Sequence, residues 1–169
     1  MNTTHIHLLL NHVSILAALF SVFIYITGTI RKNNSIKNTA LIGFVLAAIT
    51  AIPVFLTGEP AEESVEHLPG VLESVIDSHE DAAEIALWLI EITGVFALAG
   101  LFSQKIKFVT TATFSLLMVV LSLVSSVSIS YAGYLGGKIR HSELSSTTIG
   151  NGTNEDGQGE AGEKGEDED

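Results

Sequence analysis

Histidine is the residue type of this 169-residue sequence that is best suited to chemistry, and it occurs six times. The six lie at or near the ends of apolar stretches, as His5, His7, His12, His67, His79 and His141. A neutral imidazole ligates haem iron and divalent transition metals, and it also accepts protons near neutral pH. Cysteine is absent, which excludes thiolate metal sites, cysteine nucleophiles and covalent haem attachment.

A haem held between two helices is the first chemistry that these positions predict. His12 lies one to two turns inside the first apolar stretch, where an imidazole needs a ligand or a hydrogen-bond partner. On a helix His5 shares a face with His12, whereas His7 points about 140° away from it. We expect haem b with His12 and His79 as its axial pair, and His7 as the substitute for His12.

A divalent metal ion (zinc, copper or iron) is the alternative cofactor. Glu63 and His67 share a helix face at a spacing of i, i+4, and so do Glu80 and Glu84. The sequence has no Glu-x-x-His motif, which weakens a di-iron interpretation, and no His-Glu-x-x-His motif, which excludes that type of zinc-protease helix. The candidate metal ligands are His7, His12, His67, His79, His141, Glu59, Glu63, Glu80 and Glu84.

Glu91 stands apart from these residues, because it falls near the middle of the third apolar stretch. It follows Glu84 by seven positions and Trp88 by three, so the three share one helix face. An ionisable side chain at that depth is expensive and usually functional. We expect a proton or ion path through Glu91. A hydrogen bond to Thr50 or Ser122, or a contact between subunits, is the alternative.

Four long apolar stretches must position these side chains, at about residues 6–29, 38–57, 82–102 and 108–133. Each approaches or exceeds the roughly 20 residues that cross a bilayer as a helix. The sequence therefore predicts an all-α fold, a four-transmembrane-helix bundle within residues 1–142 that contacts the lipid bilayer.

The basic residues predict how this bundle is oriented. The connections after the first and third stretches carry Arg31, Lys32, Lys37, Lys105 and Lys107, whereas residues 58–81 contain no Lys or Arg. The positive-inside rule places both basic connections in the cytoplasm, although Lys138 and Arg140 weigh mildly against it. We predict both termini outside, in the bacterial inner membrane, with the histidine cluster on the periplasmic side.

Eight of the 19 acidic residues lie within residues 59–81, between the second and third stretches. Pro60 suits the first turn of a helix, and Glu62 and Glu63 follow it where negative charge is favourable. Apolar residues at 71–76 predict a second short helix, and Ser78 with Asp81 predicts the start of the third span. We expect residues 58–81 to form a short helical extracytoplasmic cap.

Nine further acidic residues lie within residues 143–169, together with many glycines and almost no apolar residue. Such a segment cannot compensate the entropy of ordering by burying apolar surface. We predict a disordered acidic tail. It would repel nucleic acid, so no nucleic-acid partner is expected.

The first helix reads His7-Leu-Leu-Leu-Asn-His12 and continues as an apolar run. This pattern resembles a family of bacterial four-helix integral membrane proteins of unknown function, whose first helix opens with His-Pro-Leu, two residues and then His. A His near the start of that family's third helix matches His79, whereas Leu8 stands where the family has Pro. The resemblance covers about residues 5–143 and implies this fold and topology, with a suspected haem or redox role.

Three functions follow as hypotheses. The first is an electron-carrying or accessory membrane subunit that holds a b-type haem or a metal ion through histidine and meets a periplasmic or membrane redox partner. The second is a proton or divalent-cation transporter that uses Glu91 and the acidic cap. The third is a structural subunit of a larger membrane complex or oligomer.

Overall fold

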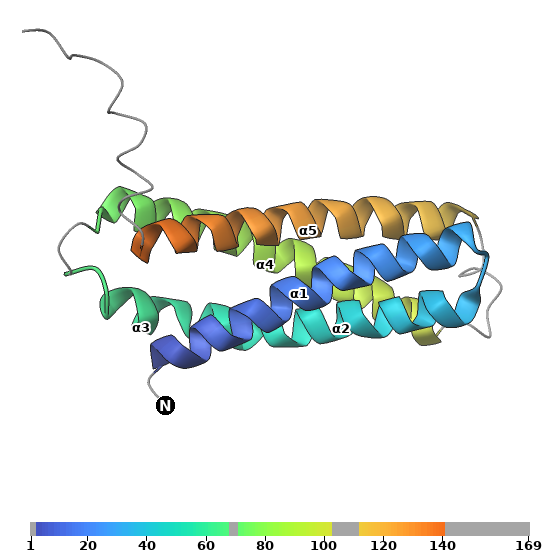
Figure 1. Ribbon diagram of the computed structural model, residues 1–169, viewed down its shortest axis with the longest axis horizontal. Coiled ribbons are helices and arrows are strands. Elements are labelled where there is room, and N and C mark those ends of the chain that lie inside the picture. Colours follow the sequence, from blue (N-terminus) through green and yellow to red (C-terminus); the bar gives the residue numbers. More distant parts are fainter. Residues whose placement is uncertain (1–2, 68–70, 103–111, 141–169) are drawn as a thin grey trace, which may run out of the picture.

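The computed structural model of the protein describes residues 3–67, 71–102 and 112–140. They form α1 (Thr3–Ile30), α2 (Asn34–Leu56), α3 (Gly58–Glu63), α4 (Glu73–Phe102) and α5 (Ala112–Arg140), with no strand among the described residues. Four long helices run side by side, and the short α3 lies at one end (Figure 1). We call this end the α3 end, and the opposite end, where α1 meets α2, the turn end.

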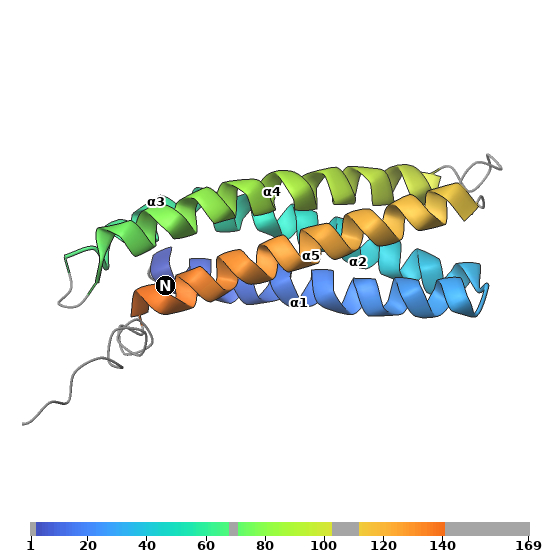
Figure 2. The same ribbon diagram turned by 90° about the horizontal axis from the view of Figure 1, so that it is seen from above.

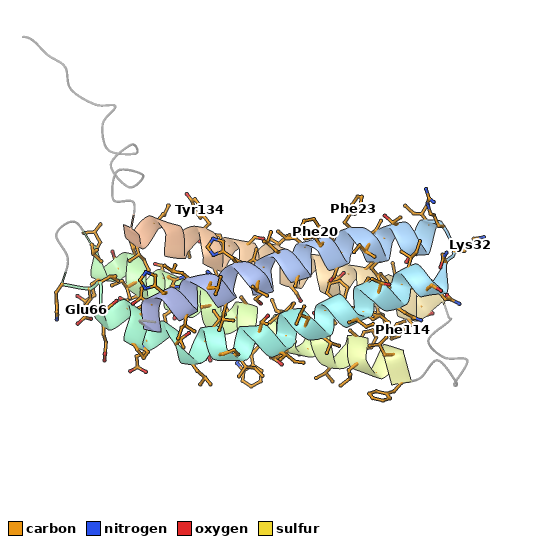
Figure 3. All side chains as sticks on the ribbon, turned by 60° about the horizontal axis from the view of Figure 1, so that its bottom comes forward. Phe20, Phe23, Lys32, Glu66, Phe114 and Tyr134 are labelled. Carbon is orange, nitrogen blue, oxygen red and sulfur yellow. The ribbon has the colours of Figure 1, made fainter. Side chains whose placement is uncertain are left out.

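The long helices α1, α2, α4 and α5 are each long and apolar enough to cross a membrane. This confirms the predicted all-α fold with four candidate spans. Many large apolar side chains point away from the bundle, among them Phe20, Phe23 and Tyr134 (Figure 3). Because a bilayer would cover such a surface, the outside of the bundle is compatible with lipid.

The order of neighbours around the bundle is α1, α2, α4 and α5, so α1 lies diagonally across from α4. Figure 2 shows α4 along one side of the bundle and α5 crossing obliquely between α1 and α4. Hydrogen bonds between side chains and main chain link adjacent helices. Ser14 Oγ of α1 donates to the Ala47 carbonyl of α2 at 3.0 Å, and Ser125 Oγ of α5 donates to the Leu89 carbonyl of α4 at 2.9 Å.

The interior is packed differently in the two halves. Toward the α3 end the buried cluster consists largely of alanines from all four long helices, such as Ala18, Ala51 and Ala86. Toward the turn end it contains larger side chains, including Tyr25 and Phe44. Small residues leave space between helices where no larger side chain fills it. The cavity described below lies in the alanine-rich half.

The helix boundaries differ from the prediction for residues 58–81. Only Thr57 separates α2 from α3, and α4 begins at Glu73 rather than near residue 82. The separate helix expected at 71–76 and the helix start expected at Ser78 are therefore wrong. Ser78 lies inside α4, and its Oγ donates to the Ser74 carbonyl at 2.7 Å. Helical hydrogen bonding continues through these polar residues because its ladder lies in the main chain, so polarity alone does not end a helix.

The short helix α3 is attached to the start of α1. Ala61 and Val65 are buried, and the hydroxyl groups of Ser64 and Thr4 lie 3.0 Å apart. The Thr57 hydroxyl donates to the carbonyls of Pro53 and Val54, at 2.7 and 3.1 Å, where α2 ends. These contacts hold α3 close to the α1 and α2 termini. The other expected boundaries were near the observed ones, except that α5 extends to Arg140 and residues 108–111 lie outside the described residues.

Candidate functional site

A cavity of about 300 Å³ opens between the long helices at the α3 end. Two imidazoles and three carboxylates line it, from His7, His79, Glu59, Glu62 and Glu80. Deeper in the bundle its walls become apolar, with Ala86, Leu87 and Ile90 from α4 and Ile129 from α5. The cavity is therefore polar toward the α3 end and largely apolar toward the centre of the bundle, where Ser14 is a polar lining residue.

The His7 ring is held by the end of α2. Its Nδ1 lies 2.9 Å from the Val54 carbonyl oxygen and 3.4 Å from the Thr57 hydroxyl. A carbonyl oxygen can only accept, so Nδ1 carries the proton in this contact. In the neutral ring Nε2 then keeps its lone pair, which is free to bind a proton or a metal ion.

The His79 ring makes the same kind of contact with α5. It is buried, and its Nδ1 lies 2.9 Å from the Ala132 carbonyl oxygen. Gly136 lies directly against the ring, since a Cβ at that position would be 3.0 Å from His79 Cε1. As in His7, the proton on Nδ1 leaves the lone pair on Nε2 of the neutral ring.

His12, the expected axial ligand, does not line this cavity. Its side chain is exposed on α1, and its Nδ1 lies 2.6 Å from the carbonyl oxygen of Leu8 in the same helix. Residues five apart on a helix point in very different directions, so turning His7 inward turns His12 outward. The structure brings His7, and not His12, together with His79.

The remaining histidines lie elsewhere. His5 is exposed, and His67 is almost fully exposed, with its Nε2 3.1 Å from a Glu66 carboxylate oxygen. His141 lies outside the described residues.

The predicted acidic ligands divide into three groups. Glu59 and Glu80 line the cavity, and they also border a second hollow beside α3, which is lined mainly by acidic residues. Glu63 borders only that hollow, and Glu84 is exposed on α4 and borders neither. Of the expected i, i+4 pairs, Glu63 with His67 has neither member at the cavity, and Glu80 with Glu84 has only Glu80 there.

Glu62 is a cavity residue that the sequence interpretation treated only as a helix-start charge. Its side chain is half-buried and lines both the cavity and the neighbouring hollow. Burial raises the pKa of the Glu62 carboxyl, and the carboxylates of Glu80, Glu59 and Asp77 raise it further. The signal in the sequence was the spacing of three from Glu59, which places both on one face of a helix.

The residues at the cavity fit a cation better than a haem. None of the described residues that line the cavity is Lys or Arg, whereas three are glutamates. Haem carries two propionates, which such a mouth would repel, and a divalent cation would be attracted. Over the described ranges, however, no three His, Asp or Glu side chains are already gathered closely enough to hold a metal ion.

Glu91 is half-buried near the middle of α4. Its Oε1 is inaccessible to solvent and has no hydrogen-bond partner among the described residues. The two partners suggested by the sequence bond elsewhere. The Thr50 hydroxyl donates to the Leu46 and Ala47 carbonyls, and the Ser122 hydroxyl donates to the Val119 carbonyl.

Comparison with known proteins gives no match: no family model, no curated protein and no solved structure is similar to this chain. The resemblance to the bacterial four-helix family therefore stays a prediction.

Proposed function

We propose that this protein is an integral membrane protein that binds a divalent transition-metal ion, such as zinc, copper or iron, through Nε2 of His7 and His79. One observation supports the proposal above all. Both rings line one cavity, and both hold Nδ1 2.9 Å from a main-chain carbonyl oxygen of a neighbouring helix. Metal-binding histidines in proteins nearly always donate their second ring N–H in this way, which fixes the ring and its tautomer.

The carboxylates supply the rest of the ligand set. Glu62 lines the cavity with both histidines, and we assign its carboxylate as the third ligand beside the two imidazole nitrogens. Two histidines, one glutamate and a water molecule form a well-known open zinc site. Glu59 and Glu80 beside it add negative charge, which attracts a divalent cation.

Haem b is the less favoured cofactor. The expected ligand His12 faces away from the cavity, and the three glutamates oppose the propionates of a haem. His7 with His79 remains the pair through which a haem would have to bind.

The positive-inside rule supports a periplasmic position for this site in a bacterial inner membrane. The α1–α2 turn at the opposite end carries Arg31 and Lys32, and Lys37 lies in the first turns of α2. With that end in the cytoplasm, α3 lies over the periplasmic mouth of the cavity as a cap.

Calorimetric titration of the detergent-solubilised protein with Zn²⁺ tests the proposal. The variants His7→Ala and His79→Ala should each weaken binding by at least about tenfold, because each removes a ligand. His12→Ala is the matched control on α1 and should bind Zn²⁺ as the wild type does. Equal affinity in all three variants would refute the site.

Absorption spectra of the same preparation, oxidised and reduced with dithionite, separate the two cofactors. We expect no Soret band and, by elemental analysis, a bound transition metal. A Soret band that is lost in His79→Ala and kept in His12→Ala would show that the cofactor at these histidines is a haem and not a metal ion.

A further inference from the structure

The carboxyl group of Glu91 is a feature that the proposed metal site does not use. Its Oε1 is buried and has no hydrogen-bond partner among the described residues. Water and ion pairs are scarce at hydrocarbon depth, so an ionisable group there is retained mainly where protons or ions move. The question is whether water can reach it.

The helix packing places Glu91 at the level of the cavity floor. Gly94 of α4 packs directly against Ala48 of α2, and these two helices run in opposite directions. Glu91 of α4 and Ala51 of α2 each lie three residues from this contact, on the side of the α3 end. The two residues are therefore at about the same depth in the bundle. Ala51 lines the cavity, and so do Ile90 and Leu87, which precede Glu91 by one and four positions, whereas Glu91 itself is not among the lining residues. The cavity therefore extends from the α3 end to the depth of Glu91.

Below that depth the interior is closed. Leu41, Phe44 and Ala97 are essentially inaccessible to solvent, and they belong to the tightly packed cluster of the turn-end half. An apolar interior at this density excludes water. Water that enters from the α3 end thus has a route to the level of Glu91, and water from the turn end has none through the described core.

The helices packed on α4 bring no counter-charge close to Glu91. In α2 the only ionisable side chain is Lys37, in its first turns at the turn end. In α5 the ionisable residues are Tyr131, Tyr134, Lys138 and Arg140, all in its last three turns at the α3 end. On α4 itself the nearest is Glu84, two turns away. The Glu91 carboxylate therefore has no basic side chain of these helices to neutralise it, and a bound proton does so instead.

We propose that Glu91 is a proton-binding site in the membrane interior that exchanges protons with water in the cavity, from the α3 end only. A hydronium ion in the cavity gives its proton to a carboxylate oxygen of Glu91 and leaves a water molecule, and release is the reverse. This site depends on the cavity and on Glu91, and not on the metal ion, so it stands or falls separately from the metal site.

Infrared spectroscopy of the protein in liposomes tests the exchange directly. In the wild type we expect a carbonyl stretch from a protonated carboxyl group in the apolar region. It should shift when H₂O is replaced by D₂O, and it should be missing in Glu91→Gln. Glu84→Gln, the matched control on the same helix, should keep the band. A band from Glu91 that does not shift in D₂O would overturn the proposal, because the group would then be sealed from water.

Labelling with dicyclohexylcarbodiimide gives a second measurement that needs no variant to fold. This apolar reagent modifies protonated carboxyl groups within membranes, and mass spectrometry locates the adduct. We expect an adduct on Glu91 whose yield falls as the pH is raised. The absence of an adduct at any pH would overturn the proposal. A yield that depends on the protein-to-lipid ratio and not on pH would also overturn it, because Glu91 would then lie at a contact between copies of the chain.

Filling the cavity floor tests the route. Ala51→Leu should slow the D₂O shift of the Glu91 band, because the larger side chain occupies the floor at the level of Glu91. Ala99→Leu, an exposed position on α4, is the control and should not change the exchange. Unchanged exchange in a folded Ala51→Leu protein would refute entry through the cavity.

Discussion

His7 and His79 come from helices that lie diagonally across the bundle, yet both line one cavity and each donates its Nδ1–H to a carbonyl of the neighbouring helix. The acceptors are Val54 of α2 for His7 and Ala132 of α5 for His79. All four long helices thus contribute to fixing two imidazoles. Displacing one ring should therefore affect metal binding even when both histidines are kept.

Gly136 offers such a displacement. A Cβ at Gly136 would lie 3.0 Å from Cε1 and 3.4 Å from Nε2 of His79, so Gly136→Ala should displace the ring by a few tenths of an ångström. We expect Zn²⁺ affinity, measured by calorimetry, to fall by about tenfold, the size of effect seen when the support of a metal ligand is removed.

Gly137→Ala is a closely matched control, because a Cβ at Gly137 would meet nothing within 4 Å. Both changes gain the same helix propensity, about 1 kcal/mol in favour of alanine. Only the crowding of His79 differs between them. Equal Zn²⁺ affinity in the two variants would show that the position of the His79 ring does not matter for binding.

Glu62 gives the site a dependence on pH. Its pKa is raised in the folded protein by burial and by the neighbouring carboxylates, so the folded state holds this proton more tightly than the unfolded state does. Without metal, stability therefore falls as the pH rises from the ordinary carboxyl range, about pH 4, through the raised pKa, and the full penalty persists above it.

The variant Glu62→Gln should remove that penalty. In thermal unfolding without metal we expect it to melt a few degrees above the wild type at neutral pH, and the difference should vanish below about pH 4. With Zn²⁺ the order should reverse, because the variant has lost a carboxylate ligand. Glu63→Gln, exposed and outside the cavity, serves as the control. A variant that binds Zn²⁺ as well as the wild type would remove Glu62 from the ligand set.

Much of the fold could be predicted because apolar length is a direct requirement of a helix that crosses a bilayer. The start of α4 could not, since residues 73–81 contain only two apolar residues, and the polar stretch 77–81 resembles a break between the short helix expected at 71–76 and the third span. They form the first turns of α4 because main-chain hydrogen bonding continues and because one face, which includes His79 and Ala82, is buried. The difference arises from tertiary packing, which the local pattern of polar residues does not contain.

The sequence also could not predict which of His7 and His12 faces the interior of the bundle. Helical periodicity gives the angle between two residues of α1, but not the rotation of the whole helix about its axis. That rotation is set by packing contacts such as Ser14 with the Ala47 carbonyl and Gly43 against Ser21. Glu62 was missed for a similar reason, because its neighbour Glu80 lies on another helix.

The hydrogen bonds between helices make a separate prediction about stability. The hydroxyl groups of Ser125 and Thr93 lie 2.6 Å apart in the buried interior, and Ser125 also donates to the Leu89 carbonyl. Ser125→Ala should cost about 1 kcal/mol of unfolding free energy, a typical value for such bonds between membrane helices. Unfolding in mixed micelles measures it. Ser128, half-buried on the same helix, provides the control, and Ser128→Ala should change the unfolding free energy little. An equal loss of unfolding free energy in Ser128→Ala would show that the effect comes from helix packing and not from the hydrogen bond.

The last prediction connects the two proposed sites through the cavity that they share. His7 and His79 line its polar end, and the cavity extends from there to the level of Glu91. A metal ion on these histidines, together with its bound Glu62, would obstruct the route by which water reaches Glu91. Saturating Zn²⁺ should therefore slow the D₂O shift of the Glu91 carbonyl band in the wild type and in His12→Ala, and it should have no effect in His79→Ala. Slowing that persists in His79→Ala would mean that zinc acts elsewhere, such as at the acidic hollow beside α3. If calorimetry shows the metal bound to the wild type and the exchange rate does not change, water must pass the occupied histidines. The two sites would then act independently.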